Sequence, residues 1–179
     1  FAPYENRLSF RYVSDLPMEA LQERVAELPE HAIVFLFVFN RDSRGNNFTH
    51  EESLRLIESH SRVPVYGPWT FYLGHGIVGG MLTSGGMQGQ TAARLAFRIL
   101  NGEPAGDIPI VTESPNRYVF DHRLLARYDL SEGLLPPGST IVHRESGFYE
   151  KYRSRIWAAA IALTGQTAII VLLLRNMRR

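Results

Sequence analysis

The residues best suited to chemistry follow three predicted strands, at the carboxyl ends where an open α/β sheet binds its ligands. These ends present carboxylates, a guanidinium, a hydroxyl and several aromatic rings. Such groups side by side favour a sugar-like or other small polar or aromatic ligand. Two simpler interpretations stay open: Arg41 with Asp42 as a local surface ion pair, and Trp69 as a packing residue. The candidate ligand-binding residues are Asp15, Arg41, Asp42, Tyr66, Trp69, Thr70, Tyr72 and His75.

The sequence contains no recognisable catalytic or metal-binding pattern. The chain has no cysteine, and its only lysine is Lys151, which excludes thiol chemistry and a Walker-type phosphate loop. The six histidines have no metal-ligand spacing, and no G-x-S-x-G nucleophile elbow is present. We therefore expect a binding domain without metal or cofactor rather than an enzyme.

The stretch Gly74-His-Gly-Ile-Val-Gly79 fits the G-x-G-x-x-G pattern of dinucleotide-binding turns. Such a turn directly follows a strand and opens a helix, and an acidic residue about 20 positions further on binds the ribose. Here six residues separate Gly67 from Gly74, and the first acid after Gly79 is Glu103. A close-packed or flexible turn is the better interpretation, and an oxidoreductase that binds a dinucleotide is the alternative.

Strand-like and helix-like segments alternate along the first 128 residues. Eight consecutive apolar residues at 32–39 indicate a strand that is buried on both faces. Asp15 is a plausible N-cap, and Thr49 with Glu52 has the pattern of a capping box. Further strands are predicted at 8–13, 63–67, 108–111 and 117–120, and helices after Asp15, after Thr49, along 92–99 and at 124–128. This order predicts an α/β fold with a mostly parallel sheet and flanking helices.

The C-terminal stretch 156–174 holds 19 residues without a charge, between basic flanks. At about 1.5 Å per residue this helix is about 28 Å long, close to the ~30 Å hydrocarbon core of a bilayer. Ala158, Ala162 and Gln166 follow one another at helical spacing, which permits two such helices to pair. We expect one transmembrane helix and a homodimer formed through it. A buried core helix and an unpaired anchor are the alternatives.

Charge is divided unevenly along the chain. Residues 1–150 carry 13 Arg and 18 acidic residues, whereas residues 151–179 carry six basic residues and no acidic one. An acidic domain excludes nucleic-acid binding on bulk electrostatics, and the basic tail suits lipid headgroups. The expected organisation is a ligand-binding domain at 1–147, a juxtamembrane linker at 148–155, the membrane helix at 156–174 and a basic stub at 175–179.

Seven stretches along the chain carry a family resemblance: 64–67, 72–80, 88–96, 99–103, 107–109, 116–121 and 135–138. Together they resemble the second lobe of a type I periplasmic binding protein. More narrowly, the chain resembles the ABC-type substrate-binding-like sensor region of bacterial membrane histidine kinases. Members of that family often carry an acid near position 70, where this chain has Thr70. If that acid contacts the ligand, the ligand class of this chain differs.

The resemblance implies one lobe of a two-lobed binding fold, with the first lobe upstream of Phe1. It implies that the domain faces the periplasm and the arginine tail the cytoplasm, at the bacterial inner membrane. The implied function is small-molecule sensing for a two-component sensor histidine kinase, in which ligand-induced lobe movement passes through the membrane helix. The alternative is a membrane-tethered solute-binding protein of an ABC-type transporter.

Overall fold

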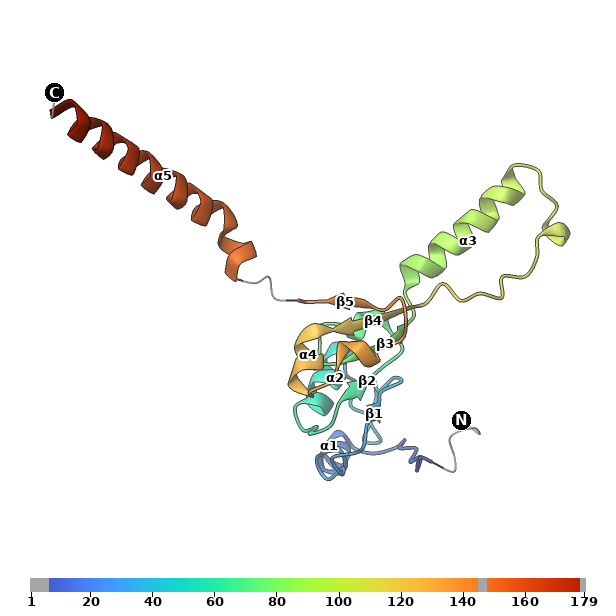
Figure 1. Cartoon of the computed structure of the whole chain (residues 1–179). Coiled ribbons are helices and arrows are strands. Elements are labelled where there is room, and N and C mark those ends of the chain that lie inside the picture. The colour runs from blue at the N-terminus through green and yellow to red at the C-terminus, as the bar shows by residue number, and fades with distance from the viewer. Residues whose placement is uncertain (1–6, 145–147, 178–179) are drawn as a thin grey trace. The chain divides into compact units, whose positions relative to one another are not determined.

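The computed structural model describes residues 7–144 and 148–177. Two compact units divide the chain, the first ending at His143 and the second beginning at Arg144 (Figure 1). The helices of the first unit are α1 (Met18–Ala26), α2 (His50–Glu58), α3 (Gly85–Leu100) and α4 (His122–Arg127). Its strands are β1 (Val34–Phe35), β2 (Val65–Tyr66), β3 (Gly79–Leu82), β4 (Arg117–Asp121) and β5 (Thr140–Val142). Short 3-10 turns occupy Thr70–Tyr72, Ala105–Asp107 and Glu132–Leu134, and α5 (Phe148–Met177) belongs to the second unit.

Strands β1 and β2 form a small parallel sheet, with Val34 opposite Val65. Helix α2 connects them, as parallel neighbours require a crossover. Only one face of the β1 segment is covered, because Leu36 is buried while Phe35 and Phe37 are exposed. Successive side chains of an extended segment point to opposite faces. The prediction that 32–39 is buried on both faces was therefore wrong.

Helices α1 and α2 pack apolar stripes into the core beside this sheet. The stripes consist of Met18, Leu21 and Val25 in α1 and Leu54 and Ile57 in α2. The predicted capping box of α2 is confirmed, since the Thr49 N–H donates to Glu52 Oε2 at 2.8 Å and the Glu52 N–H to Thr49 Oγ1 at 3.1 Å. Asp15 does not cap α1, which begins at Met18 directly after Pro17.

Strands β3, β4 and β5 form a second, mixed sheet in which β4 is central, antiparallel to β3 and parallel to β5. Gly79 makes the β3–β4 pairing possible. Its φ is 143°, and a Cβ there would collide with the Val119 carbonyl oxygen and with Phe120. Gly79 therefore lies in a strand and does not open a helix, which disagrees with a dinucleotide-binding turn.

The predicted fold class was wrong. Two small sheets replace the single, mostly parallel sheet, because the glycine-rich stretch forms β3 and pairs antiparallel with β4. The segments 8–13 and 108–111 form no strand, whereas the strand predicted at 117–120 is present as β4.

The predicted membrane-spanning helix is also corrected. Across the residues that the structure describes, no helix combines the length and the apolar character needed to cross a bilayer. The side chains of residues 168–174 lie outside the described part. The homodimer predicted through this segment stays a prediction.

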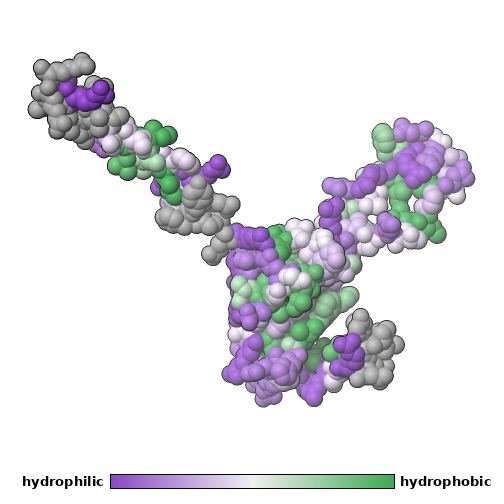
Figure 2. Space-filling view, in the orientation of Figure 1, coloured by the Kyte–Doolittle hydropathy of each residue, from purple (hydrophilic) through white to green (hydrophobic). Residues whose placement is uncertain are grey.

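Residues 84–116 form an arm whose helix, α3, has no buried residue. The arm closes at its base, where the Asn116 side-chain amide donates to Thr83 Oγ1 at 2.8 Å. The helix ends as predicted, with Asn101 as C-cap and Gly102 at a φ of 95°. Figure 2 shows hydrophobic residues (green) at the surface of this arm.

Asp121 joins β4 to α4 and to the end of β5. Its fully buried carboxylate accepts hydrogen bonds from the Arg123 backbone N–H (3.0 Å) and guanidinium (3.1 and 2.7 Å). The same carboxylate lies 2.8 Å from Nδ1 of His143. Burial alone would raise the pKa of Asp121, but the bonds from Arg123 and His143 together hold that pKa below its ordinary value of 3.8.

Candidate functional site

Five aromatic side chains form a continuous row at the carboxyl ends of β1 and β2. We call the set Phe35, Phe37, Trp69, Phe71 and His50 the aromatic row. Phe35 and Phe37 point to the same side of the β1 segment because they are two residues apart. Trp69 and Phe71 follow β2, and His50 is the first residue of α2.

Each ring of the aromatic row contacts the next. The ring centroids of Phe35 and Phe37 are 6.3 Å apart, and Phe37 meets Trp69 edge-on at 6.2 Å. Trp69 stacks on Phe71 at 5.8 Å with an interplanar angle of 10°, and Phe71 stacks on His50 at 4.6 Å. The indole Nε1–H of Trp69 donates to the Phe37 carbonyl oxygen at 3.0 Å. This bond links the two strand ends and fixes the indole.

Much of the aromatic row faces solvent. Phe35, Phe37 and Phe71 are 57, 63 and 44% exposed, although large apolar side chains normally gain free energy from burial. A contiguous exposed apolar patch is a candidate binding surface. Flat rings that are held in fixed orientations can stack against a ring of a ligand. The aromatic row is therefore suited to bind a flat, partly apolar molecule by stacking.

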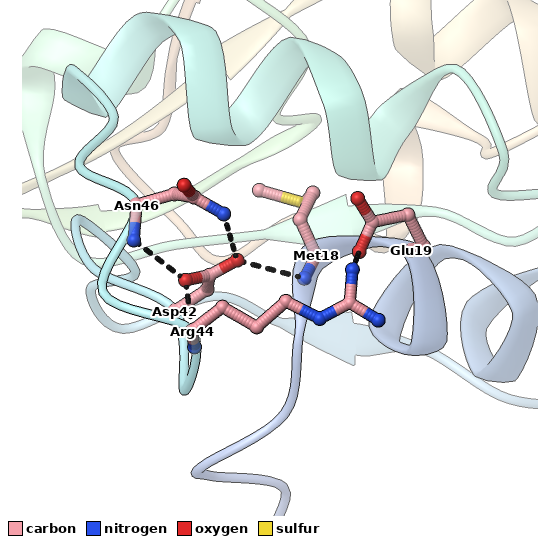
Figure 3. A network of polar contacts seen from close by, with 5 residues as sticks. All are labelled: Met18, Glu19, Asp42, Arg44 and Asn46. Carbon is pink, nitrogen blue, oxygen red and sulfur yellow. Dashed lines mark hydrogen bonds and ion pairs between the residues drawn. The ribbon is translucent and has the colours of Figure 1, made fainter.

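Asp42 has a structural role that leaves its carboxylate fully engaged (Figure 3). It accepts from the backbone N–H groups of Met18 (3.5 Å), Arg44 (3.0 Å) and Asn46 (2.8 Å), and from the Asn46 side chain (3.0 Å). Burial would raise the pKa of Asp42, but these hydrogen bonds lower it below 3.8. The charged carboxylate thus holds the loop through Arg44 and Asn46 in place. It also caps α1, because it accepts a hydrogen bond from the Met18 N–H at the start of that helix.

Arg41 and Asp15 lie apart from the aromatic row. Among the described residues, neither forms an ion pair or a ring contact with a member of the row. Arg41 is exposed at the edge of the loop, where its guanidinium lies near Gly45. Asp15 is exposed, with a φ of 54°. The alternative interpretation of Arg41 and Asp42 as an ion pair is not supported, because Asp42 is bonded to Met18, Arg44 and Asn46 instead.

Three other predicted site residues are close to Trp69 in the sequence but are not part of the exposed row. Tyr72 is fully buried and meets the His50 ring edge-on at 6.2 Å; burial raises the pKa of its hydroxyl. Tyr66 is half-buried in β2, and burial likewise raises its pKa. The Thr70 hydroxyl donates to the Thr83 carbonyl oxygen at 3.2 Å. Of the three, Tyr72 contacts rings of the row, whereas Tyr66 packs against the cluster of Val78, Phe120 and Leu125.

His75 contacts the first turn of α2 rather than a ring of the aromatic row. Its Nδ1 is 3.0 Å from Glu51 Oε1, next to the His50 that ends the aromatic row. Of the eight predicted residues, Trp69 belongs to the aromatic row and the other seven do not. Phe35, Phe37, Phe71 and His50 were not among the predicted site residues. The alternation of phenylalanines at 35, 37 and 39 is the signal that could have found the first two.

Comparison with family models, with curated proteins and with solved structures gives no match for this chain. The family resemblance of the sequence therefore stays a prediction, and the functional argument depends on the geometry of the aromatic row.

Proposed function

We propose that the first unit of this chain is the small-molecule-binding domain of a bacterial receptor, and that its ligand stacks on the aromatic row. The observation that carries the proposal is the contiguous exposed row of rings at the carboxyl ends of two parallel strands. Ligands of open α/β sheets bind at these ends. The sensor histidine kinase and the periplasmic setting are parts of the same proposal, and they derive from the sequence resemblance.

The ligand class follows from the chemistry of the row. Stacking on aromatic rings contributes about 0.5–1.5 kcal/mol per ring pair beyond the burial of area. A ligand with a flat apolar face, such as an aromatic acid or a sugar ring, gains from several rings at once. The exposed imidazole of His50 offers a polar group at the end of the row. We therefore expect a flat molecule with at least one polar edge.

The rings of the row are held in fixed positions before a ligand binds, and this order supports a binding role for the exposed surface. The hydrogen bond from Trp69 to the Phe37 carbonyl oxygen holds the indole before any ligand arrives. The buried Tyr72 contacts both Phe71 and His50 and fixes the other end. Rings that are already ordered lose little conformational entropy when a ligand binds.

The test is a thermal-shift screen of sugars, amino acids and aromatic acids on the 179-residue chain, followed by calorimetry on each hit. Phe37→Ala removes a ring that is 63% exposed, so the fold should tolerate it. We expect this variant to lose about tenfold in affinity, since tenfold corresponds to about 1.4 kcal/mol. The matched control is Tyr12→Ala, which removes an 83% exposed ring outside the row.

The paired variants separate the proposal from a general loss of surface area. Unchanged affinity in Tyr12→Ala and weakened affinity in Phe37→Ala support binding on the row. Equal affinities in the two variants would place the ligand elsewhere and contradict the proposal.

A further inference from the structure

A pocket of about 310 Å³ lies beside the turn at Gly74–Gly76. Its walls come from that turn, from Glu58 at the end of α2, and from Asp121, Arg123 and Arg127 of β4 and α4. No member of the aromatic row is among the residues that line it. The pocket is therefore separate from the proposed ligand surface.

Two ion pairs cross the wall of this pocket. Arg123 binds Asp121, and Arg127 binds Glu58, which joins α4 to α2. The side chains of the two acids are recessed, with 0 and 17% exposed, whereas those of the two arginines are 50 and 52% exposed. The formal charges balance, but the accessible ones are positive. An incoming ligand meets guanidinium groups first, which favours an anion.

The guanidinium of Arg127 has capacity beyond its bond to Glu58. A guanidinium carries five N–H donors in a rigid fork. Within the described part of the chain, its hydrogen bond to Glu58 comes from Nη1, and the guanidinium carbon lies over the Tyr128 ring, 5.3 Å from the centroid. The rest of the fork has the geometry that binds a carboxylate through two parallel hydrogen bonds.

Two glycines allow the turn beside the pocket to pack against His143 and Glu58. Gly74 has a φ of 86°, and a Cβ there would meet Cε1 of His143 at 3.0 Å. Gly76 has a φ of 136°, and a Cβ there would meet Cγ of Glu58 at 3.0 Å. Larger residues at these positions would be strained and would crowd the neighbouring walls.

We propose that this pocket is a second ligand site, which binds a small organic carboxylate through Arg127, with the exposed positive charge of Arg123 beside it. A volume of about 310 Å³ suits a molecule of a few heavy atoms. A monoanion fits better than a phosphate dianion, because Glu58 and Asp121 repel additional negative charge. The inference does not depend on ligand binding at the aromatic row.

The pocket is connected to the end of the first unit. Asp121, which lines it, also contacts His143, the last residue of that unit. A carboxylate that draws Arg123 toward itself changes the surroundings of Asp121 and hence of His143. The imidazole NMR signal of His143 therefore reports occupancy of the pocket, and a His143→Gln variant assigns it.

The experiment titrates the 179-residue chain at constant pH and ionic strength with acetate, pyruvate, succinate and glutamate. Sodium chloride and inorganic phosphate serve as comparison titrations. We expect at least one carboxylate to move the His143 signal saturably, with phosphate weaker. Phosphate binding more tightly than all four carboxylates overturns the ligand class, and no saturable shift with any of them overturns the site.

Variants with opposite expected signs make the test specific. Arg127→Gln should weaken binding about tenfold through loss of the charged fork. Glu58→Gln should tighten it about threefold, because it removes a competing carboxylate. A merely structural role of the ion pair would make both variants weaker, and that result contradicts the proposal.

Three further variants serve as controls. Arg62→Gln removes an exposed guanidinium elsewhere and should leave binding unchanged. Trp69→Ala should also leave it unchanged, so failure of the aromatic-row proposal does not affect this one. If Arg127→Gln does not fold, Arg127→Lys retains the charge that faces Glu58 but lacks the fork. Carboxylate binding of wild-type strength in Arg127→Lys overturns the proposed recognition by Arg127.

Discussion

Gly79→Ala is expected to destabilise the first unit by about 3 kcal/mol, which corresponds to a fall of roughly 10 °C in Tm. Two effects add at this position. Gly79 has a φ of 143°, which L side chains rarely adopt, and an added Cβ would collide with the Val119 carbonyl oxygen and with Phe120. Those atoms belong to the paired strand β4, so relief of the collision would break the β3–β4 ladder.

The measurement is thermal unfolding followed by circular dichroism, with Gly89→Ala as the matched control. Gly89 lies within α3, and a Cβ there meets nothing within 4 Å. Alanine favours a helix over glycine by about 1 kcal/mol, so the control should be as stable as the wild type or more so. A wild-type Tm in Gly79→Ala would contradict the antiparallel register of β3 and β4.

Asp121→Asn is expected to cost about 3 kcal/mol at neutral pH, because it leaves two basic side chains beside a buried neutral group. The charged carboxylate accepts from Arg123 and lies against His143 with its own side chain fully buried. An amide of the same shape cannot accept all of these hydrogen bonds. The side chains of Arg123 and His143 would lose their shared anionic partner.

The pH dependence of the same variant follows from the lowered pKa of Asp121. An aspartate with a folded pKa below its ordinary 3.8 stabilises the protein fully above about pH 4. This contribution is lost as the pH falls through the folded pKa. The difference in Tm between wild type and Asp121→Asn should therefore be largest near pH 7 and should shrink below about pH 4.

Asp107→Asn is the control for this prediction, since Asp107 is an exposed carboxylate in a short turn. It should unfold with a Tm close to that of the wild type at every pH. A Tm difference between Asp121→Asn and wild type that stays constant from pH 7 to pH 3 would contradict the assigned ion pair.

Locally encoded features were predictable from the sequence. The capping box of Thr49 and Glu52 depends on two residues three positions apart, and it forms as predicted. The end of α3 at Asn101 and Gly102 is likewise set by neighbouring residues. The strand at 117–120 was found because it reads as an apolar run bounded by turn residues.

Features that depend on distant pairing were not predictable. The chain at Gly79–Leu82 is rich in glycine, and only its pairing with β4 makes it a strand. The apolar run at 32–39 indicated a strand correctly but did not tell which face another element covers. Exposure of Phe35 and Phe37 depends on the packing of other elements, which a pattern within one strand does not contain.

The candidate site was only partly predictable for the same reason. Trp69 was predicted as a site residue, and the structure places it in the centre of the aromatic row. Asp42 was predicted to face a ligand, yet its carboxylate accepts hydrogen bonds from the backbone N–H groups of Met18, Arg44 and Asn46. Composition alone cannot separate a carboxylate that caps its own loop from one that faces a ligand.

The most direct test of the central claim uses Trp69 as its own reporter. The chain has two tryptophans, so Trp157→Phe leaves Trp69 as the only one. A hit from the ligand screen is titrated into this variant, and the Trp69 emission is compared with calorimetry on the same sample. We predict a saturable change in emission whose Kd equals the calorimetric one. Calorimetric binding with unchanged Trp69 emission would contradict ligand binding on the aromatic row.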